Sequence, residues 1–332
     1  MTLSKPKMRA GASMLALVVA VAIAPAAAEQ VTSFDIPGST ATSAEGVAAD
    51  GTIVGYYRDQ AGAAHGFLRA SDGTVTSFDP KGSTGTFPFA INGKGATAGL
   101  YFDGKDRQHG FVRTAEGKFE TFDPKGAFDT QPYSISDNGS VTGIWQDSSL
   151  VMHGFVRTAD GTITSFDPDG AIFTEAFGIN ADGTIAGLYD DSNHLTHSFV
   201  RTADGTFTSF DVPGASYTDA FAINNKGAVT GVYFEGASFY GFVRSADGKI
   251  RKFGKWGYPT EPHAISDAGN IAGFYNNGLK NRGFFRDASG RVATFSPLKS
   301  RDTEPRAVND SGIVAGYYSD RKSRIHGFIR TP

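Results

Sequence analysis

The stretch PFAINGKGATAGLYFDGKDRQHGFVRTAEGKFETFD, residues 88–123, decides the fold. Turn sequences, among them Gly93-Lys94-Gly95 and Glu116-Gly117, divide it into four short apolar runs: 88–92, 96–102, 108–115 and 118–123. Glycine adopts positive φ without steric cost, so a Gly-containing turn between two such runs is typical of a β-hairpin. The stretch therefore predicts four consecutive antiparallel strands.

The same four-run pattern recurs along the rest of the chain. A Phe near the end of the fourth run repeats every 42 to 44 residues, at Phe34, Phe78, Phe122, Phe166, Phe210, Phe253 and Phe295. A four-stranded unit of this length is typical of one blade of a β-propeller. Seven copies predict an all-β, seven-bladed β-propeller with four-stranded blades, numbered 1 to 7 here in chain order.

The two ends of the repeat array predict how the ring closes. Residues 31–35 (VTSFD) form a lone strand of the fourth type, and the chain ends just after a third-type strand, HGFIR, at 326–330. An open array would leave its strand edges unpaired, whereas the N-terminal strand can complete the last blade. We therefore predict a single propeller over residues 29–332, closed by strand 31–35 in blade 7.

The first 28 residues carry the features of a secretory signal peptide. Lys5, Lys7 and Arg9 precede an apolar run at 14–23, and Ala26-Ala27-Ala28 supplies the small residues of a cleavage site. The apolar run is shorter than the ~20 residues of a membrane span, so we expect no membrane insertion after cleavage. An uncleaved anchor is the alternative. The prediction is a secreted or periplasmic protein.

Composition excludes several classes of site and partner. The chain contains no Cys, which rules out disulfides, thiolate zinc sites and iron–sulfur clusters. Its 31 basic and 34 acidic residues give a slightly acidic balance, which argues against a nucleic-acid partner. We expect a monomer.

The repeated motif resembles that of the HAF extracellular-repeat family. The matching stretches include HGFVRTADG at 153–161, TFTSFDVPGA at 206–215 and AINNKG at 222–227, with Gly in place of the family's middle Ala. The resemblance covers the chain after the signal peptide and implies an exported bacterial repeat protein. It implies no established activity and no catalytic residues.

Residues that repeat in every blade are expected to be structural, because every blade has the same packing problem. A Thr is expected one to three residues before each first strand, where its hydroxyl satisfies a backbone group; a Thr ring lining the channel is the alternative. These residues are Thr42, Thr86, Thr130, Thr174, Thr218, Thr260 and Thr303. An Arg near the end of each third strand is expected to bond neighbouring carbonyls or Asp side chains. These are Arg69, Arg113, Arg157, Arg201, Arg244, Arg286 and Arg330.

Two further sets of residues at equivalent repeat positions, called columns here, carry groups that could mimic a metal or catalytic site. A His begins five third strands and an Asp ends five fourth strands, and we expect a structural His–Asp hydrogen bond: His65, His109, His153, His197 and His326, with Asp79, Asp123, Asp167, Asp211 and Asp35. Acidic residues also open the loop after six of the second strands: Asp59, Asp103, Asp147, Asp191, Glu235 and Asp320. Calcium binds carboxylate oxygens, but no D-x-D-x-D-G loop is present. We therefore predict no cofactor or metal and keep calcium only as an alternative.

The candidate site lies where the repeat breaks. At one position of the first strand, blades 2 to 5 carry aromatic residues, whereas blades 6, 7 and 1 carry His263, Arg306 and Glu45. Two residues earlier stand acidic residues in blades 4 to 7: Glu175, Asp219, Glu261 and Glu304. Because first strands are innermost in a propeller, we predict a polar sector at the funnel mouth with Glu45, Glu261, His263, Glu304 and Arg306.

The loop before blade 6 also departs from the repeat. It reads Gly254-Lys255-Trp256-Gly257-Tyr258 where most other blades carry Asp-x-Pro-Gly or Asp-Pro-x-Gly, and it offers Trp256 and Tyr258 as an aromatic platform. Aromatic faces beside carboxylates and Arg suit a sugar. Sequence drift in the terminal repeats is the alternative explanation for these irregularities.

These features favour an exported binding or interaction module whose ligand, a carbohydrate in our hypothesis, binds at the funnel mouth near blades 6, 7 and 1. A glycan or an envelope protein would be the partner. No G-x-S-x-G, H-E-x-x-H or P-loop pattern is present, and we assign no catalytic residue. Two alternatives stay open: a polysaccharide hydrolase or lyase that uses the funnel carboxylates, and a structural protein of the envelope or matrix.

Overall fold

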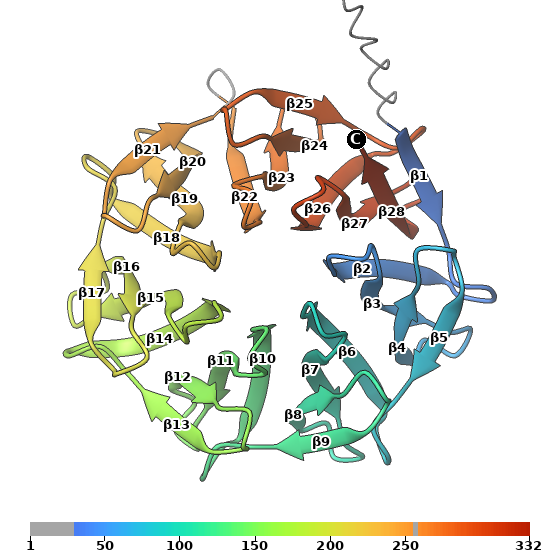
Figure 1. Ribbon diagram of the computed structural model, residues 1–332, viewed down its shortest axis with the longest axis horizontal. Coiled ribbons are helices and arrows are strands. Elements are labelled where there is room, and N and C mark those ends of the chain that lie inside the picture. Colours follow the sequence, from blue (N-terminus) through green and yellow to red (C-terminus); the bar gives the residue numbers. More distant parts are fainter. Residues whose placement is uncertain (1–29, 255–257) are drawn as a thin grey trace, which may run out of the picture.

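The computed structural model describes residues 30–254 and 258–332. Over these residues the chain forms seven antiparallel sheets of four strands each, arranged as a ring (Figure 1). The predicted all-β, seven-bladed propeller is confirmed. The described residues include no helix with the length and apolar character that a bilayer crossing requires.

Each blade places its first strand at the axis and its fourth at the rim (Figure 1). Blade 1 contains β2 (Ala41–Val47), β3 (Ile53–Arg58), β4 (Ala64–Arg69) and β5 (Val75–Phe78). Blade 2 contains β6 (Gly85–Ile91), β7 (Thr97–Phe102), β8 (Gln108–Arg113) and β9 (Phe119–Phe122). Blade 3 contains β10 (Asp129–Ile135), β11 (Val141–Gln146), β12 (Met152–Arg157) and β13 (Ile163–Phe166). Blade 4 contains β14 (Ala171–Ile179), β15 (Ile185–Asp191), β16 (Thr196–Arg201) and β17 (Phe207–Phe210).

The last three blades follow the same order. Blade 5 contains β18 (Tyr217–Ile223), β19 (Val229–Glu235), β20 (Ser238–Arg244) and β21 (Ile250–Phe253). Blade 6 contains β22 (Thr260–Ile265), β23 (Ile271–Asn276), β24 (Asn281–Arg286) and β25 (Val292–Phe295). Blade 7 contains β26 (Asp302–Val308), β27 (Val314–Ser319), β28 (Ile325–Thr331) and the N-terminal strand β1 (Gln30–Phe34).

The N-terminal strand closes the ring as predicted. β1 pairs antiparallel with β28 in a register that runs from Gln30 opposite Thr331 to Phe34 opposite Gly327. Figure 1 shows the two ends of the propeller chain side by side in this blade. The first and last segments of the repeat array therefore share one sheet, and the blade at the seam has four strands like the others.

The innermost strands begin earlier than predicted. β6 starts at Gly85 rather than at Pro88, and Thr86 already pairs with Tyr101 of β7. The prediction that the Thr column precedes the first strand is therefore wrong. The cause is that the buried hydroxyl reaches back to the incoming connection while the backbone is already in the ladder. Thr42 Oγ1 accepts the Ile36 N–H at 3.1 Å, and Thr86 donates to Asp79 Oδ1 at 2.5 Å.

The propeller has two different faces. The upper face carries the loops between second and third strands and the connections from one blade to the next. The lower face carries the tight turns between first and second strands and between third and fourth strands, many of which contain a glycine with positive φ, such as Gly95 (φ 79°). The first strand of each blade runs from the upper to the lower face.

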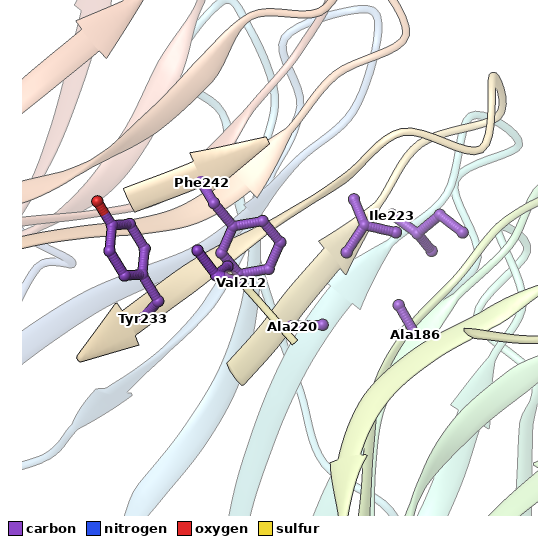
Figure 2. Packing of buried hydrophobic residues seen from close by; sticks show 7 residues of the cluster. Ala186, Val212, Ala220, Ile223, Tyr233 and Phe242 are labelled. Carbon is purple, nitrogen blue, oxygen red and sulfur yellow. The ribbon is translucent and has the colours of Figure 1, made fainter. Parts of the chain in front are cut away.

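The core lies between blades rather than at the axis. Figure 2 shows one such cluster, in which Val212, Ala220 and Phe242 of the blade 5 repeat pack with Ala186 of blade 4. The third-strand Phe is fully buried in six blades and nearly so in the seventh: Phe67, Phe111, Phe155, Phe199, Phe242, Phe284 and Phe328. Truncating a buried Phe to Ala typically costs ~3–5 kcal/mol, so each of these side chains contributes substantially to the stability of its blade.

Close packing explains two repeated glycines of blade 2. A Cβ added at Gly99 would lie 2.2 Å from the Phe87 carbonyl oxygen of the neighbouring first strand. A Cβ at Gly110 would lie 2.7 Å from the ring of Phe122, which covers this glycine from the fourth strand. Both contacts are far below van der Waals distance, so any larger residue requires the strands to separate.

The Arg column joins consecutive blades. Arg113 stacks over the Phe78 ring of the preceding blade at 4.9 Å and donates to the Thr114 carbonyl at 3.3 Å. Equivalent cation–π contacts recur in the other blades, for example Arg201 over Phe166 at 4.6 Å. The predicted carbonyl bonds are therefore present. The stacking on the neighbouring blade gives the guanidinium a second role that the sequence did not indicate.

The predicted His–Asp bonds lie on the upper face, away from the axis. His65 Nδ1 is 2.7 Å from Asp79 Oδ2, and the same pairing occurs in blades 2, 3, 4 and 7. The other ring nitrogen approaches the loop Asp, as between His65 Nε2 and Asp59 Oδ2 at 3.5 Å. Each imidazole therefore bridges two carboxylates at the edge of its own blade, which is the structural role expected for this column.

Candidate functional site

A β-bulge at the same place in all seven innermost strands builds the candidate site. In β6 the register shifts between Pro88 and Ala90, so Phe89 is the inserted residue. An inserted residue leaves the pleat alternation, which lets the bulge re-aim its side chain. The seven inserted residues line one cavity of about 400 Å³ at the axis: Glu45, Phe89, Tyr133, Phe177, Phe221, His263 and Arg306.

Four aromatic side chains from blades 2 to 5 form one wall of this cavity. Neighbouring ring centroids lie 6.0 Å apart for Phe89–Tyr133, 5.5 Å for Tyr133–Phe177 and 5.7 Å for Phe177–Phe221. Tyr133 and Phe177 stack, while Phe177 and Phe221 meet edge to face. The wall is a continuous band of aromatic surface that a ligand in the channel would contact.

The other three inserted residues form a polar chain across blades 6, 7 and 1. Arg306 Nε lies 3.3 Å from Glu45 Oε2, and Arg306 Nη1 lies 3.0 Å from His263 Nδ1. Ser43 donates to the second oxygen of Glu45 at 2.5 Å. Burial raises the pKa of Glu45, whose side chain is only 7% exposed, and Arg306 and Ser43 oppose this effect.

The contacts of His263 define its tautomer. Arg306 can only donate, so His263 Nδ1 accepts and the ring proton resides on Nε2. That nitrogen lies 4.0 Å from Glu261 Oε2. Burial lowers the pKa of His263, with Arg306 adding to the effect and Glu261 opposing it. The imidazole is therefore neutral near pH 7, and its Nε2–H is available to donate a hydrogen bond.

Glu261 and Glu304 lie one layer above the cavity lining, toward the upper face. Glu304 Oε2 accepts from the Tyr317 hydroxyl at 3.0 Å, and its other oxygen accepts from Asn281 Nδ2 at 3.3 Å. The electrostatic interactions of Glu304 with Glu45 and Arg306 place it beside the polar chain. These two residues therefore border the entrance rather than the cavity wall.

The structure thus brings five of the predicted residues together: Glu45, Glu261, His263, Glu304 and Arg306. Tyr258 is 39% exposed, its ring faces Tyr275 at 6.5 Å, and it does not line the cavity. Trp256 lies outside the described residues, as does the predicted signal peptide.

Sequence reasoning missed part of the lining. The aromatic residues of blades 2 to 5 were interpreted as the regular pattern from which the site departs, yet they are four of the seven residues that line the cavity. It also left Glu175 and Asp219 out of the site, although they occupy the same position as Glu261. Burial raises the pKa of both carboxyls to about 7, and neighbouring carboxylates add to the effect. Their shared repeat position with Glu261 could have identified Glu175 and Asp219 from the sequence.

The five loop aspartates have a turn role. Asp103 Oδ1 accepts the N–H groups of Lys105 and Arg107 at 2.7 and 3.0 Å, and the aspartates of blades 1, 3, 4 and 7 repeat this arrangement. Asn277 does the same in blade 6 with a neutral oxygen. Within residues 30–254 and 258–332, no group of three or more His, Asp or Glu side chains is arranged to hold a metal ion.

Comparison with solved structures identifies the class of protein as a β-propeller. A virginiamycin B lyase from Staphylococcus aureus, solved with quinupristin, is 14% identical over 92% of this chain and 99% of that chain, with a TM-score of 0.61. The propeller domain of the Trilobed protease from Pyrococcus furiosus is 8% identical over 88% and 94%, with a TM-score of 0.62. A puromycin hydrolase is 14% identical over 88% of this chain and 55% of that chain, with a TM-score of 0.62.

At these identities the likeness concerns the fold alone. No family model matches the chain, and no curated protein matches it. The particular activity must therefore be argued from the residues of the channel.

Proposed function

We propose that the protein is an exported binding module that takes its ligand into the channel from the upper face. The observation that carries this proposal is the ring of seven inserted residues that line the cavity, called the bulge ring below. The same backbone device occurs in all seven blades, but it presents four aromatic rings on one side and the Glu45–Arg306–His263 chain on the other. A ligand with both a hydrophobic face and polar groups matches this division.

Carbohydrate is the ligand class that these two walls favour. The C–H faces of a sugar ring pack on aromatic side chains, while its hydroxyls exchange hydrogen bonds with carboxylate, guanidinium and imidazole groups. The cavity of about 400 Å³ has the size of a small-ligand site. A glycan, free or attached to an envelope protein, is the proposed partner.

Exposed apolar side chains support entry from the upper face. Among the described residues, those that are large, apolar and exposed lie almost entirely in upper-face loops or strand ends, with Val292 on the lower face as the exception. The upper-face set comprises Phe128, Leu150, Val151, Ile172, Leu195, Phe239, Tyr258, Leu279 and Leu298. These side chains come from blades 3 to 7, so they make the upper face the more apolar of the two without forming one defined patch.

Export rests on the sequence features of residues 1–28 and on the resemblance to the HAF repeats. Both are part of the proposal, and secretion or periplasmic location follows from them. Periplasmic processing of the expressed chain, read as the N-terminal residue of the mature protein, would test this part directly.

The binding proposal is tested by thermal denaturation with a panel of neutral and acidic oligosaccharides, calcium and a chelator. A ligand at a hundredfold excess over its Kd should stabilise the protein by about 2.7 kcal/mol. The effect should disappear in Phe177→Ala and in Arg306→Met, which change opposite walls, but persist in Asp182→Asn on the lower face. A panel without any shift would contradict the proposal.

A hydrolase or lyase is the second candidate, and the two carboxyls with pKa near 7 are the observation in its favour. A carboxyl that titrates at neutral pH is suited to general acid or base catalysis. Incubating each stabilising oligosaccharide with the protein separates the two: product formation that is lost in Glu175→Gln or Asp219→Asn supports an enzyme, and an unchanged oligosaccharide supports a binding module.

A further inference from the structure

Four carboxylates lie on blades 4 to 6, nearer the upper face than the inserted residues that line the cavity. We call them the carboxylate collar. Glu175, Asp219 and Glu261 stand two residues before the inserted residue on β14, β18 and β22. Asp190 of β15 is the fourth member. Asp219 interacts electrostatically with each of the other three, so the group forms one cluster of like charge.

The collar has hydrogen-bond donors but no cationic Lys or Arg partner among the described residues. Asp190 accepts from the Thr196 hydroxyl at 2.6 Å, and Asp219 Oδ2 accepts from the Tyr217 hydroxyl. Within the described chain, the one ionisable donor near the Glu261 carboxylate is the neutral imidazole of His263, at 4.0 Å. No hydrogen bond or ion pair joins Glu175 to a described residue. The nearby cation, Arg306, is already paired with Glu45.

Asp219 adds an independent sign of a missing partner. Its residue surface is 5% exposed, and its Oδ1 atom is buried without any hydrogen-bond partner in the described part of the chain. A buried carboxylate oxygen without a donor is costly, and neighbouring negative charges increase the cost. A proton or a bound cation beside Asp219 and Glu175 would relieve this cost, and burial raises the pKa of both carboxyls.

The aromatic wall decides between an inorganic and an organic cation. Phe177 and Phe221 line the cavity on two of the collar blades, and Tyr133 of blade 3 stacks on Phe177 beside them. Aromatic rings attract a cation through their faces and also pack against carbon, whereas a metal ion requires several oxygen ligands in a fixed geometry. The described residues provide no such set of metal ligands. An ammonium group carried on an organic body uses both the collar and the wall.

We propose that the channel entrance is a recognition site for an organic ammonium group, held by the carboxylate collar with its carbon skeleton against the aromatic wall. This inference rests on the proposed binding function and defines its ligand more closely. For a carbohydrate it specifies an amino sugar, while the same ammonium group on a polypeptide would come from a lysine side chain.

The test measures binding by isothermal titration calorimetry with matched ligands near neutral pH. A glucosamine trimer is compared with the N-acetylglucosamine trimer, which has the same rings but no charge. A short lysine peptide is compared with its acetyl-lysine form. The expected result is that at least one amine binds about tenfold or more tightly than its acetylated counterpart, the size of one charge-assisted hydrogen bond.

Two variants connect this preference to the collar. Glu175→Gln and Asp219→Asn should each weaken amine binding about tenfold while leaving the weaker binding of the acetylated ligand unchanged. Asp182→Asn, an exposed lower-face change of the same charge, is the control and should bind like the parent protein. Circular dichroism melting of each variant shows whether it is folded.

The outcomes separate this inference from the proposed function. Equal binding of amine and acetylated ligands, or an unchanged preference in both collar variants, would overturn the ammonium site but leave a neutral ligand site standing. Displacement of the amine by calcium at equal concentration would also overturn it, in favour of an inorganic cation. If none of the four ligands binds, and neutral and acidic oligosaccharides also fail to stabilise the protein, the proposed function fails as well. A preference confined to the peptide pair would support the ammonium site and identify its source as lysine.

Discussion

The third strand and the bulge ring show how one repeat yields both scaffold and site. Each third strand places the same buried Phe against its neighbours and the same Arg at the blade junction. The bulge ring also uses one backbone device seven times, but its side chains differ between blades 2 to 5 and blades 6, 7 and 1. Residues that pack between blades face identical surroundings in every copy. Side chains at the axis face one another, so a change in one blade alters a single shared cavity without disturbing the blade behind it.

The largest expected effect comes from breaking the scaffold at its seam. Deleting Gln30–Phe34 removes the outer strand of blade 7, together with the Phe34 ring that covers Gly327 and packs on Phe67. The loss in free energy of unfolding should exceed the ~3–5 kcal/mol of a single buried aromatic truncation, because a whole strand is lost with it. Thermal melting followed by circular dichroism measures this against a chain that begins at residue 30. An unchanged melting temperature would refute ring closure by β1.

A pair of Phe truncations compares the two regions directly. Phe111→Ala should destabilise the protein by ~3–5 kcal/mol, because its fully buried ring leaves a cavity between blades. Phe177→Ala in the bulge ring should cost less than half as much, because its ring borders a cavity that already exists. Denaturant titration gives both values. Equal losses would mean that the aromatic wall is part of the core, and the distinction between scaffold and site would fail at this position.

Repetition also explains how much the sequence could predict. Seven copies of one pattern defined the blades and the seam, because every copy supplies an independent test of the same strand arrangement. The polar residues of blades 6, 7 and 1 stood out as departures, and Glu45, His263 and Arg306 do line the cavity. Repetition led to a wrong interpretation where a repeated aromatic residue lines the cavity instead of packing in the core. Phe89 and Phe177 resemble core residues in a repeat alignment, and only the bulge turns them toward the axis.

Other features depended on three-dimensional contacts that a sequence pattern does not encode. β6 starts early because Gly85 and Thr86 already pair with β7, while the Thr86 hydroxyl bonds Asp79 in the connection from blade 1. The collar depends on Asp190, which comes from a second strand and shares no repeat position with Glu175 or Asp219. Its membership follows from the spatial proximity of neighbouring blades.

The third prediction concerns the polar half of the bulge ring. Arg306→Met keeps the length of the side chain but removes the cation beside the buried carboxylate of Glu45. The free energy of unfolding should fall by about 1–3 kcal/mol, because the Glu45 carboxylate would stay buried without its charged donor. Adding Glu45→Gln should recover part of the loss, which a double-mutant cycle by denaturant titration would measure. Additive losses would show that the two side chains do not act as a pair.

The smallest expected effect concerns the pH dependence of the outer His–Asp pairs. The hydrogen bond with Asp79 raises the pKa of His65 above 6.5. Burial lowers the pKa of His109, but Asp123 and Asp103 together outweigh this effect, so its pKa is raised as well. A raised histidine pKa contributes stability that is complete below pH 6.5 and is lost as the pH rises through the folded pKa. On the acid side, the N–H bonds from Arg107 and Lys105 lower the pKa of Asp103, so its contribution is lost as the pH falls through that lower value.

These pairs are largely exposed to solvent, which screens them, so the contribution of each to stability should be small. The melting temperature of the parent protein should therefore decline slightly above pH 6.5, and the decline should be smaller in the double variant His65→Gln, His109→Gln. His194→Gln is the control, since this imidazole lies exposed in an upper-face loop and forms no bond to a carboxylate of the described chain. A decline of the same size in the double variant would trace the pH dependence to other groups. A smaller decline would show that the repeated imidazoles stabilise the blades chiefly in their charged form, whereas His263 in the channel is held neutral by burial and by Arg306.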